Sequence, residues 1–293
     1  MEGCHSMDTS DELGETEHRA IVRRLVDDWY AHRTAGGTFV MRRKNRKTHE
    51  AQFAMVYAFA AQAHATALAF LAAVDVAPPI VASPLARAIF EHALTAQWIA
   101  QVPDAYQAMG AEEARQRRNL ATTLRRTAID AYLEAADKVT PSRLDELESA
   151  SLAGARNFEA LCGDLVPGKD QAYSIYRILS MEAHPTLLVA DQWFAPAREG
   201  STARATLLVR PHELESPWTP VVASSLVWAG RAFDYFDGSH ARRSLLRSTA
   251  RALGIPEELK ESPESQKRRA EADRQRRKAK QAAASGSNSE RPS

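Results

Sequence analysis

The spacing of apolar residues along the chain predicts a series of amphipathic helices. In most long segments apolar residues recur at steps of three and four, the period of an α-helix with one buried face. The clearest case is a heptad-like seam of Val222, Leu226, Ala229, Phe233 and Phe236. The helices predicted from this pattern cover residues 16–33, 50–74, 84–102, 104–137, 141–162, 169–184 and 218–252, with a short helical piece at 187–195.

Capping residues and helix breakers define where these segments begin and end. Ser83 and Pro84 suit the N-cap and the first helical position of the third segment. Gly254 and Pro256 end the last segment, since neither residue type continues a helix well. About seven helices joined by short connections predict an all-α fold, a multi-helix bundle.

Composition divides the chain into three parts. Residues 1–15 are predicted to be disordered, residues 16–258 to form the helical bundle domain, and residues 259–293 to form a basic, largely disordered tail whose first part suits an exposed helix. The formal net charge is +1, but residues 260–293 carry ten Lys and Arg against five Asp and Glu. This tail and the basic segment 42–47 could engage nucleic-acid phosphates. The sequence favours a solvated, nonspecific tail instead, because Glu271 and Asp273 interrupt its cations and no aromatic residues are interleaved to stack bases.

An alanine-rich stretch is long enough to cross a membrane. Residues 51–74 are 24 positions without a formal charge, and a basic segment precedes them. However, Gln62, His64 and Thr66 lie near the centre, where polar groups are costly in hydrocarbon. We therefore expect a buried core helix, with His64 as a core histidine, and no membrane span.

Other classes of site lack the residues that they need. The two cysteines, Cys4 and Cys162, are too few for a disulfide framework or a zinc site, and the acidic N-terminus does not resemble a secretory signal, so a cytoplasmic location is expected. His92 follows Glu91, but no second ligand stands at a useful spacing for zinc. The sequence also lacks the Walker A, GxGxxG, GxSxG and HExxH motifs, and we expect neither a metal nor a cofactor.

The segment YSIYRILSMEAHP (173–185) places four chemically active side chains on one face of a helix. At steps of four, three and four, this face carries Tyr173, Arg177, Ser180 and His184. An imidazole transfers protons near neutral pH, and a guanidinium holds a phosphate and offsets developing charge. A metal-free ribonuclease requires these groups. The alternative is that the face is simply the hydrogen-bonded side of an amphipathic helix.

A second pair, Arg87 and Glu91, lies at i and i+4 on the edge of an apolar stripe. A charge pair in that position is partly buried and needs further partners, because unpaired buried charge is costly. We therefore predict that this helix packs on the 169–184 helix and that one polar cluster contains Arg87, Glu91, Arg177 and His184. A structural network that fixes the register of the helices would produce the same pattern.

Two motifs resemble a widespread, uncharacterised family of bacterial all-helical proteins. The segment LARAIFEHALTAQWI (85–99) is similar to the family's helix with an Arg and a Glu. The segment YRILSMEAHP (176–185) is similar to its helix with the pattern Tyr-x-x-x-Ser-x-x-x-His. This resemblance implies an all-helical fold and carries no established activity.

The second motif also resembles the HEPN superfamily, helical bundles that include metal-independent ribonucleases of toxin and antiviral systems. The HEPN signature is an Arg, four to six residues, and a His on one helix, which Arg177 and His184 match with six residues between them. The residue after the Arg is commonly polar in that superfamily, whereas here it is Ile178. The resemblance implies RNA as the substrate and a homodimer whose two motifs face each other.

Together these features predict a HEPN-like, metal-independent ribonuclease of a defence or toxin system. His184 would be the general base or acid and Arg177 the phosphate anchor. Glu91 and Arg87 would orient them, and the supporting side chains would be Tyr173 and Ser180. Two other functions remain open: a non-enzymatic helical scaffold or interaction protein whose polar cluster is structural, and a bundle that binds a small ligand between its helices.

Overall fold

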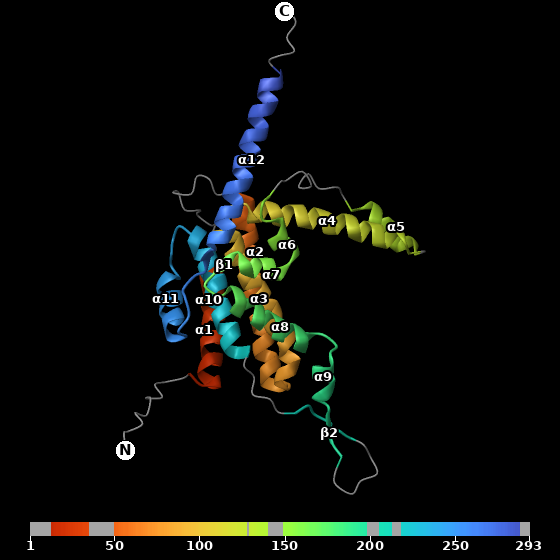
Figure 1. Ribbon diagram of the computed structural model, residues 1–293. Coiled ribbons are helices and arrows are strands. Elements are labelled where there is room, and N and C mark those ends of the chain that lie inside the picture. Colours follow the sequence, from red (N-terminus) through yellow and green to blue (C-terminus); the bar gives the residue numbers. More distant parts are fainter. Residues whose placement is uncertain are drawn as a thin grey trace, which may run out of the picture. The chain divides into compact units, whose positions relative to one another are not determined.

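A computed structural model describes most of the chain (Figure 1). The described residues are 13–34, 50–127, 129–139, 149–197, 205–212 and 218–287. Most of the predicted disordered N-terminus, the basic segment 42–47 and the first part of the predicted helix 141–162 lie outside these ranges.

Over the described residues the chain forms twelve α-helices and four short strands, so the all-α class is confirmed and the predicted number of about seven helices is wrong. The helices are α1 (Glu15–Thr34), α2 (Glu50–Val76), α3 (Pro79–Gln101), α4 (Ala105–Arg125), α5 (Asp130–Asp137), α6 (Leu152–Arg156), α7 (Phe158–Gly163), α8 (Lys169–Ala183), α9 (Leu187–Asp191), α10 (Trp218–Phe236), α11 (Arg243–Ala252) and α12 (Pro263–Ser287). The strands form two antiparallel pairs, β1 (Leu165–Val166) with β4 (Lys260–Glu261) and β2 (Phe194–Pro196) with β3 (Ala205–Leu207). The number is higher because the helices predicted as continuous over 104–137 and 218–252 are each interrupted, and two short helices, α6 and α7, cover the end of the predicted helix 141–162. The other two additional helices are α9, in the short piece at 187–195, and α12, in the predicted tail.

The chain divides into two compact units, and three helices, α2, α3 and α8, contribute residues to both. Unit 1 consists of Met1–Asn45, Phe59–Ala93 and Tyr176–Glu257, and unit 2 consists of Arg46–Ala58, Leu94–Ile175 and Glu258–Ser293. The sequence predicted one helical domain over 16–258. Three of the boundaries fall inside α2, α3 and α8 rather than in linkers, so no change of composition marks these three in the sequence.

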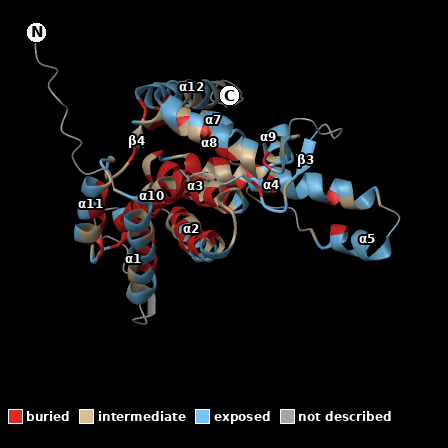
Figure 2. Cartoon of the chain, turned by 90° about the horizontal axis from the view of Figure 1, so that it is seen from below, coloured by how far each residue is buried: buried red, intermediate tan, exposed pale blue. Residues whose placement is uncertain are grey.

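The core of unit 1 is built on the contact between α1 and α10. The predicted heptad-like seam of α10 is buried along its whole length, and Figure 2 shows α10 mainly in the colour of buried residues. Trp29 of α1 stacks on His64, with ring centroids 4.2 Å apart, and meets Phe233 edge-on at 5.4 Å. The Nδ1 of the fully buried His64 bonds the carbonyl oxygen of Ala60, which confirms the predicted core histidine.

The predicted helix 218–252 is interrupted where α10 ends, at the sequence DGSH. The carboxylate of Asp237 accepts hydrogen bonds from the backbone nitrogen of Ser239 at 3.0 Å and from its hydroxyl at 2.7 Å. His240 then adopts a φ of 50°, in the left-handed region. Asp and Ser side chains bond nearby backbone groups in this way and so favour a turn over continued helix.

A buried carboxylate joins α10 to α11 within unit 1. Asp234 is only 1% exposed, and one of its oxygens accepts from Arg231 at 2.7 Å and from Arg243 at 3.3 Å. Such a carboxylate is stable in the interior only while the guanidinium groups compensate its charge.

A buried arginine joins α11 to α1. The guanidinium of Arg242 donates to the carboxylate of Asp28 and lies 5.0 Å from the ring centroid of Trp29. Burial lowers the pKa of Arg242, and its hydrogen bond to Asp28 opposes that shift. The ionic contacts of Arg242 and Asp234 thus both hold α11 in unit 1, one on α1 and the other on α10.

The packing of unit 2 centres on Trp98 of α3. This side chain is fully buried, and its Nε1 donates to the carboxylate of Asp164 at 3.0 Å. Gly154 of α6 lies so close to the indole that a Cβ there would come within 2.7 Å of Trp98 Cζ2. The approach of α6 to α3 therefore requires a glycine at this position.

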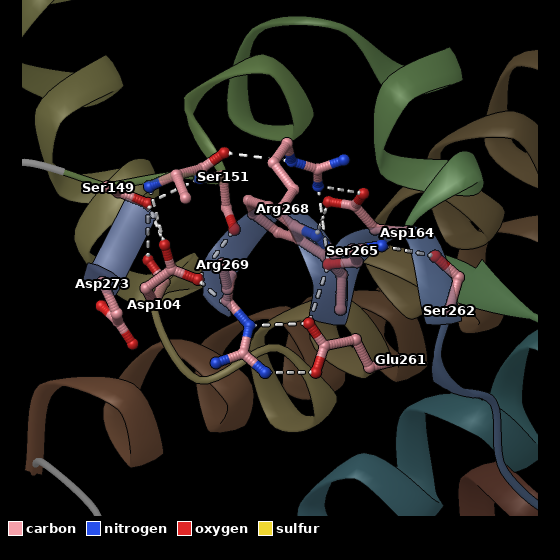
Figure 3. A network of polar contacts seen from close by, with 12 residues as sticks. Asp104, Ser149, Ser151, Asp164, Glu261, Ser262, Ser265, Arg268, Arg269 and Asp273 are labelled. Atoms are coloured by element: carbon pink, nitrogen blue, oxygen red, sulfur yellow. Dashed lines mark hydrogen bonds and ion pairs between the residues drawn. The ribbon is translucent and has the colours of Figure 1, made fainter. Parts of the chain in front are cut away.

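Polar side chains attach the start of α12 to the core of unit 2 (Figure 3). Asp164 also accepts from Arg268 at 2.6 Å, and its carbonyl oxygen accepts from the backbone nitrogen of Ser262 at 2.8 Å. Arg269 binds both carboxylate oxygens of Glu261, at 2.7 and 2.5 Å, and this hydrogen bonding raises the pKa of Arg269. The first part of the predicted tail, which suits an exposed helix, forms α12, and these contacts fix its start in unit 2.

A carboxylate in α4 binds three side chains of unit 2. Glu112 accepts from Arg115 at 2.7 Å, from Gln116 at 2.7 Å and from Arg156 of α6 at 3.2 Å. These hydrogen bonds, that of Arg115 above all, lower the pKa of Glu112 to about 2 against the opposing effect of burial. Folding therefore favours the charged form of Glu112.

Among the described residues, α2 is the one helix whose length and composition would allow it to cross a membrane, which is weak evidence for a span. Its buried residues lie on one face at steps of three and four: Gln52, Val56, Ala60, Ala63, His64, Ala67, Phe70, Leu71 and Val74. The side chains of Gln62 and Leu68 are exposed on other faces. A single buried stripe is typical of a helix packed on the rest of a protein, in agreement with the predicted core helix.

Replacing Asp234 by Ala should destabilise unit 1, because it removes a carboxylate that compensates the buried guanidinium of Arg231. We expect the free energy of unfolding to fall by about 3 to 5 kcal/mol, as for other broken buried ion pairs. Urea denaturation measures the loss. The control is Asp27→Ala, an exposed carboxylate on α1, which should change stability by less than about 0.5 kcal/mol. Equal effects of the two substitutions would contradict the role given to Asp234.

Glu112 should make part of the stability depend on pH. Because its pKa is lower in the folded than in the unfolded chain, its contribution is present above about pH 4.5 and is lost as the pH falls towards 2. We expect Glu112→Gln to lower the free energy of unfolding by about 2 kcal/mol at pH 7 and by progressively less below pH 4.5. Urea denaturation across this pH range tests the prediction, with Glu113→Gln, a substitution of an exposed carboxylate, as control. If the difference in the free energy of unfolding between Glu112→Gln and wild type does not change with pH, the prediction is wrong.

Candidate functional site

Within unit 1, one carboxylate joins α8 to two other helices. Glu182 accepts from the hydroxyl of Ser83 in α3 at 2.5 Å and from Nε1 of Trp218 in α10 at 2.7 Å, both at the same oxygen. Ser83 is fully buried and Trp218 nearly so. These contacts, which we call the Glu182 network, hold the last turn of α8 against α3 and α10.

The predicted start of the third helix is wrong. α3 begins at Pro79, five residues earlier than predicted, and Pro84 lies inside it. Pro79 suits a first helical position as well as Pro84 does, because the missing N–H is not needed there. Ser83 is therefore not an N-cap, and its hydroxyl is available to bind Glu182 instead.

A second polar group centres on Arg87, one turn further along α3. Its Nε donates to Glu91 at 2.9 Å, its Nη2 donates to the hydroxyl of Tyr176 at 3.3 Å, and its Nη1 contacts Nε2 of His184. The guanidinium carbon also lies 5.2 Å from the ring centroid of Tyr176, in cation–π range. We call these four residues, Arg87, Glu91, Tyr176 and His184, the Arg87 cluster.

The contact between Arg87 and His184 defines the state of the imidazole. A guanidinium carries only donors, so the lone pair of His184 Nε2 must accept the hydrogen bond. The ring proton then lies on Nδ1. In this arrangement Nε2, the nitrogen of His184 with the free lone pair, is already bound by the guanidinium of Arg87.

The Arg87 cluster is more open to solvent than the Glu182 network. The side chain of Arg87 is 19% exposed and that of Glu91 is 34% exposed, and His184 is exposed directly after the end of α8. An anion approaching from solvent can therefore reach both a guanidinium and an imidazole. A phosphate is the natural ligand for such a pair, since Arg offers two donors in a plane.

The structure brings together three of the four residues predicted to cluster. Arg87 links Glu91 to His184, as predicted from the charge pair on the apolar stripe of α3. Arg177 is exposed on α8, and the residue before it, Tyr176, binds Arg87 through its hydroxyl.

Among the predicted supporting residues, Tyr173 lies in the part of α8 that belongs to unit 2, and Tyr176 supplies the hydroxyl. The hydroxyl of Ser180 is buried and has no hydrogen-bond partner within the described part of the chain. Tyr176, Ser180 and His184 follow one another at steps of four, which is the Tyr-x-x-x-Ser-x-x-x-His spacing of the second motif, whereas the predicted site took Tyr173 from steps of four, three and four.

Glu182 was missed by the sequence analysis, although a signal for it exists. It follows Leu179, the buried residue of α8, by three positions and so shares its face. A carboxylate on a buried face requires donors, and the sequence does not indicate that Ser83 and Trp218 provide them.

Other reactive side chains have structural roles. In the described ranges no group of three His, Cys, Asp or Glu residues is arranged to hold a metal ion. His92 bonds the carbonyl oxygen of Ala88 and packs against Phe59, which gives it a place in the helix packing. Burial raises the pKa of the Cys162 thiol to about 12, so this cysteine is unsuited to nucleophilic chemistry.

A surface cleft of about 620 Å³ in unit 1 offers a separate place for a small ligand. Its polar lining includes Arg19, Asp75, Arg210 and His212, and Trp193 forms part of its wall. The residues that line it do not include those of the Arg87 cluster. A small-ligand function would therefore use a different surface from a phosphate-binding function.

Comparison of the chain with protein-family models, with curated proteins and with solved structures finds no match. The resemblances to an uncharacterised bacterial family and to the HEPN superfamily therefore stay predictions from the motifs.

Removing the carboxylate of Glu182 should cost more stability than removing that of Glu91. Glu182→Ala leaves the buried hydroxyl of Ser83 and the indole N–H of Trp218 unsatisfied, which should lower the free energy of unfolding by about 1 to 3 kcal/mol. Glu91→Ala breaks an ion pair open to solvent and should cost less than about 1 kcal/mol. Urea denaturation of both variants tests the distinction. The assignment fails if Glu91→Ala is the more destabilising substitution.

Proposed function

We propose that the chain is a HEPN-like, metal-independent ribonuclease that acts at the Arg87 cluster. The observation that supports this most directly is the contact of Arg87 Nη1 with His184 Nε2 at a solvent-open surface. Cleavage of RNA by its own 2′-hydroxyl needs one group that moves a proton and one that offsets charge on the phosphate. The imidazole and the guanidinium supply these two functions side by side.

In the proposed reaction the 2′-oxygen attacks the adjacent phosphorus, and the bond between phosphorus and the 5′-oxygen breaks. His184 accepts the proton of the 2′-hydroxyl, and the resulting imidazolium returns a proton to the departing 5′-oxygen. The products are a 2′,3′-cyclic phosphate and a 5′-hydroxyl. Atoms and charge balance without a further reactant.

Arg87 has two tasks in this scheme. In the free protein its Nη1 occupies the lone pair of His184, and a bound phosphate oxygen would take over that N–H and release Nε2 for the 2′-hydroxyl. Glu91 and Tyr176 hold the guanidinium at its other nitrogens, so its plane is preorganised for the phosphate. Arg177, exposed on α8 two turns before His184, is placed to anchor a neighbouring phosphate.

The second candidate function is a non-enzymatic helical scaffold or interaction protein in which the Arg87 cluster only fixes helix register. The adjacent Glu182 network favours the scaffold function. Its buried hydrogen bonds join α3 to α8, the two helices that the Arg87 cluster also joins, so polar side chains already fix the packing there. Against it, an exposed imidazole adds little to the stability of such a network. The two functions predict different consequences for removing His184.

His184→Ala should abolish RNA cleavage without unfolding the chain. We expect the cleavage rate in EDTA to fall by a factor of about 10² to 10⁴, the usual contribution of a positioned general base. Labelled single-stranded RNA, gel analysis and detection of the cyclic phosphate measure the reaction. Circular dichroism melts of the same samples should differ by only a few degrees.

The control is His212→Ala, which removes another exposed histidine of unit 1, one bonded to the carbonyl oxygen of Phe194. It should leave cleavage unchanged. If wild type does not cleave RNA and His184→Ala lowers the melting temperature strongly, the ribonuclease proposal is wrong and the structural function stands. Equal loss of cleavage in both histidine variants would also count against the assignment of His184.

A further inference from the structure

The C-terminal helix α12 carries an unusual concentration of exposed positive charge. Over Pro263–Ser287 the sequence has eight Lys and Arg, three Asp and Glu, and none of Val, Leu, Ile, Met, Phe, Tyr or Trp. Among the described side chains from 270 to 282, all but Ala272 and Arg276 are exposed, and Figure 2 shows much of α12 in the colour of exposed residues. This half of α12 therefore has no buried face.

The first turns of α12 are fixed in unit 2, so the exposed part extends from a defined base. Arg268 binds the nearly buried carboxylate of Asp164, and Arg269 binds Glu261 through two hydrogen bonds (Figure 3). These two arginines are used for attachment. The cations beyond them lie along the continuous, mostly exposed part of the helix.

The acidic residues of α12 all lie in its first half, whereas basic residues continue into its second half. The acids Glu271 and Asp273 lie before the distal cations and face Arg274 and Arg276 at 3.5 and 3.8 Å. From residue 274 to the end of α12 there is no acid, and the basic residues are Arg274, Arg276, Arg277, Lys278 and Lys280. At about 100° per residue these five side chains cover an arc of about 200°.

We propose that the distal half of α12 binds the phosphate backbone of nucleic acid. Five cations within two helical turns match the charge density of a polyphosphate chain, and their binding releases counterions. The absence of aromatic residues from α12 leaves no platform for base stacking, so binding is independent of sequence.

An anionic membrane surface is a poorer partner for this helix. A helix that lies on a membrane buries an apolar face among the acyl chains, and α12 has no large apolar side chain to provide one. The inference does not depend on cleavage at His184, because α12 and the Arg87 cluster belong to different units.

The test compares nucleic-acid binding by the full chain and by a variant with five substitutions, R274Q, R276Q, R277Q, K278Q and K280Q. Glutamine keeps helix propensity and length while removing the charge. We expect fluorescence anisotropy with single-stranded RNA and with duplex DNA at 50 mM salt to show at least tenfold weaker binding by the variant. The slope of log K against log salt should also become shallower by about 3 to 4.

The matched control removes two exposed arginines of α4, which lie outside the run of cations on α12. Because Arg117 and Arg125 are eight residues apart and form no such run, the R117Q/R125Q variant should bind as wild type does. The His184→Ala protein should also bind as wild type does. If it does and no variant cleaves RNA, the inference on α12 holds while the ribonuclease proposal fails.

Two results would overturn the inference. One is nucleic-acid binding that the five substitutions leave unchanged in affinity and salt slope. The other is binding to vesicles of phosphatidylserine and phosphatidylcholine with no binding to RNA or DNA under the same conditions. Circular dichroism of the variant checks that α12 keeps its helix.

Discussion

The geometry of the candidate site depends on the two hydrogen bonds that Glu182 accepts. Ser83 and Trp218 are buried polar groups on different helices, and each needs an acceptor because an unsatisfied buried donor is costly. One carboxylate oxygen serves both and thereby holds the last turn of α8 in place. His184 follows two residues later, and its imidazole reaches Arg87 because that turn cannot shift. The stability of a buried network thus decides the position of an exposed side chain.

The two polar networks on α3 and α8 differ in the way that structural and functional sites usually differ. The Glu182 network is buried and consists of donors and an acceptor that satisfy one another, which suits a role in holding helices. The Arg87 cluster is open to solvent and contains a cation and an imidazole in contact. Such a pair can bind an anion, whereas its exposed contacts contribute little to the free energy of unfolding. This contrast is the physical basis for preferring a phosphate-directed function for the Arg87 cluster over a role in helix register.

Charged side chains fix the packing of helices in some parts of the chain and are exposed to solvent in others. In unit 1, Asp234 and Arg242 are nearly inaccessible and require partners, so they specify how α11 meets α10 and α1. In unit 2, Arg268 and Arg269 attach α12 through carboxylates. Beyond them most of the Arg and Lys side chains of α12 are exposed, and two of the arginines pair with nearby acids of the same helix. Composition alone cannot separate these roles, because the difference lies in what surrounds each guanidinium.

The sequence by itself determined the all-α class, the buried seam of α10, the bounds of α1 and α8 to within about one residue, and the pairing of Arg87 with Glu91. These features depend on the helical period and on neighbours three or four positions apart, which are local. The tertiary structure decided which atoms meet: Ser83 binds Glu182, Tyr176 supplies the hydroxyl at Arg87, and the predicted proximity of Arg87 and His184 is a direct contact. Periodicity shows that a polar group on a buried face needs a partner, but the identity of the partner depends on how distant helices pack.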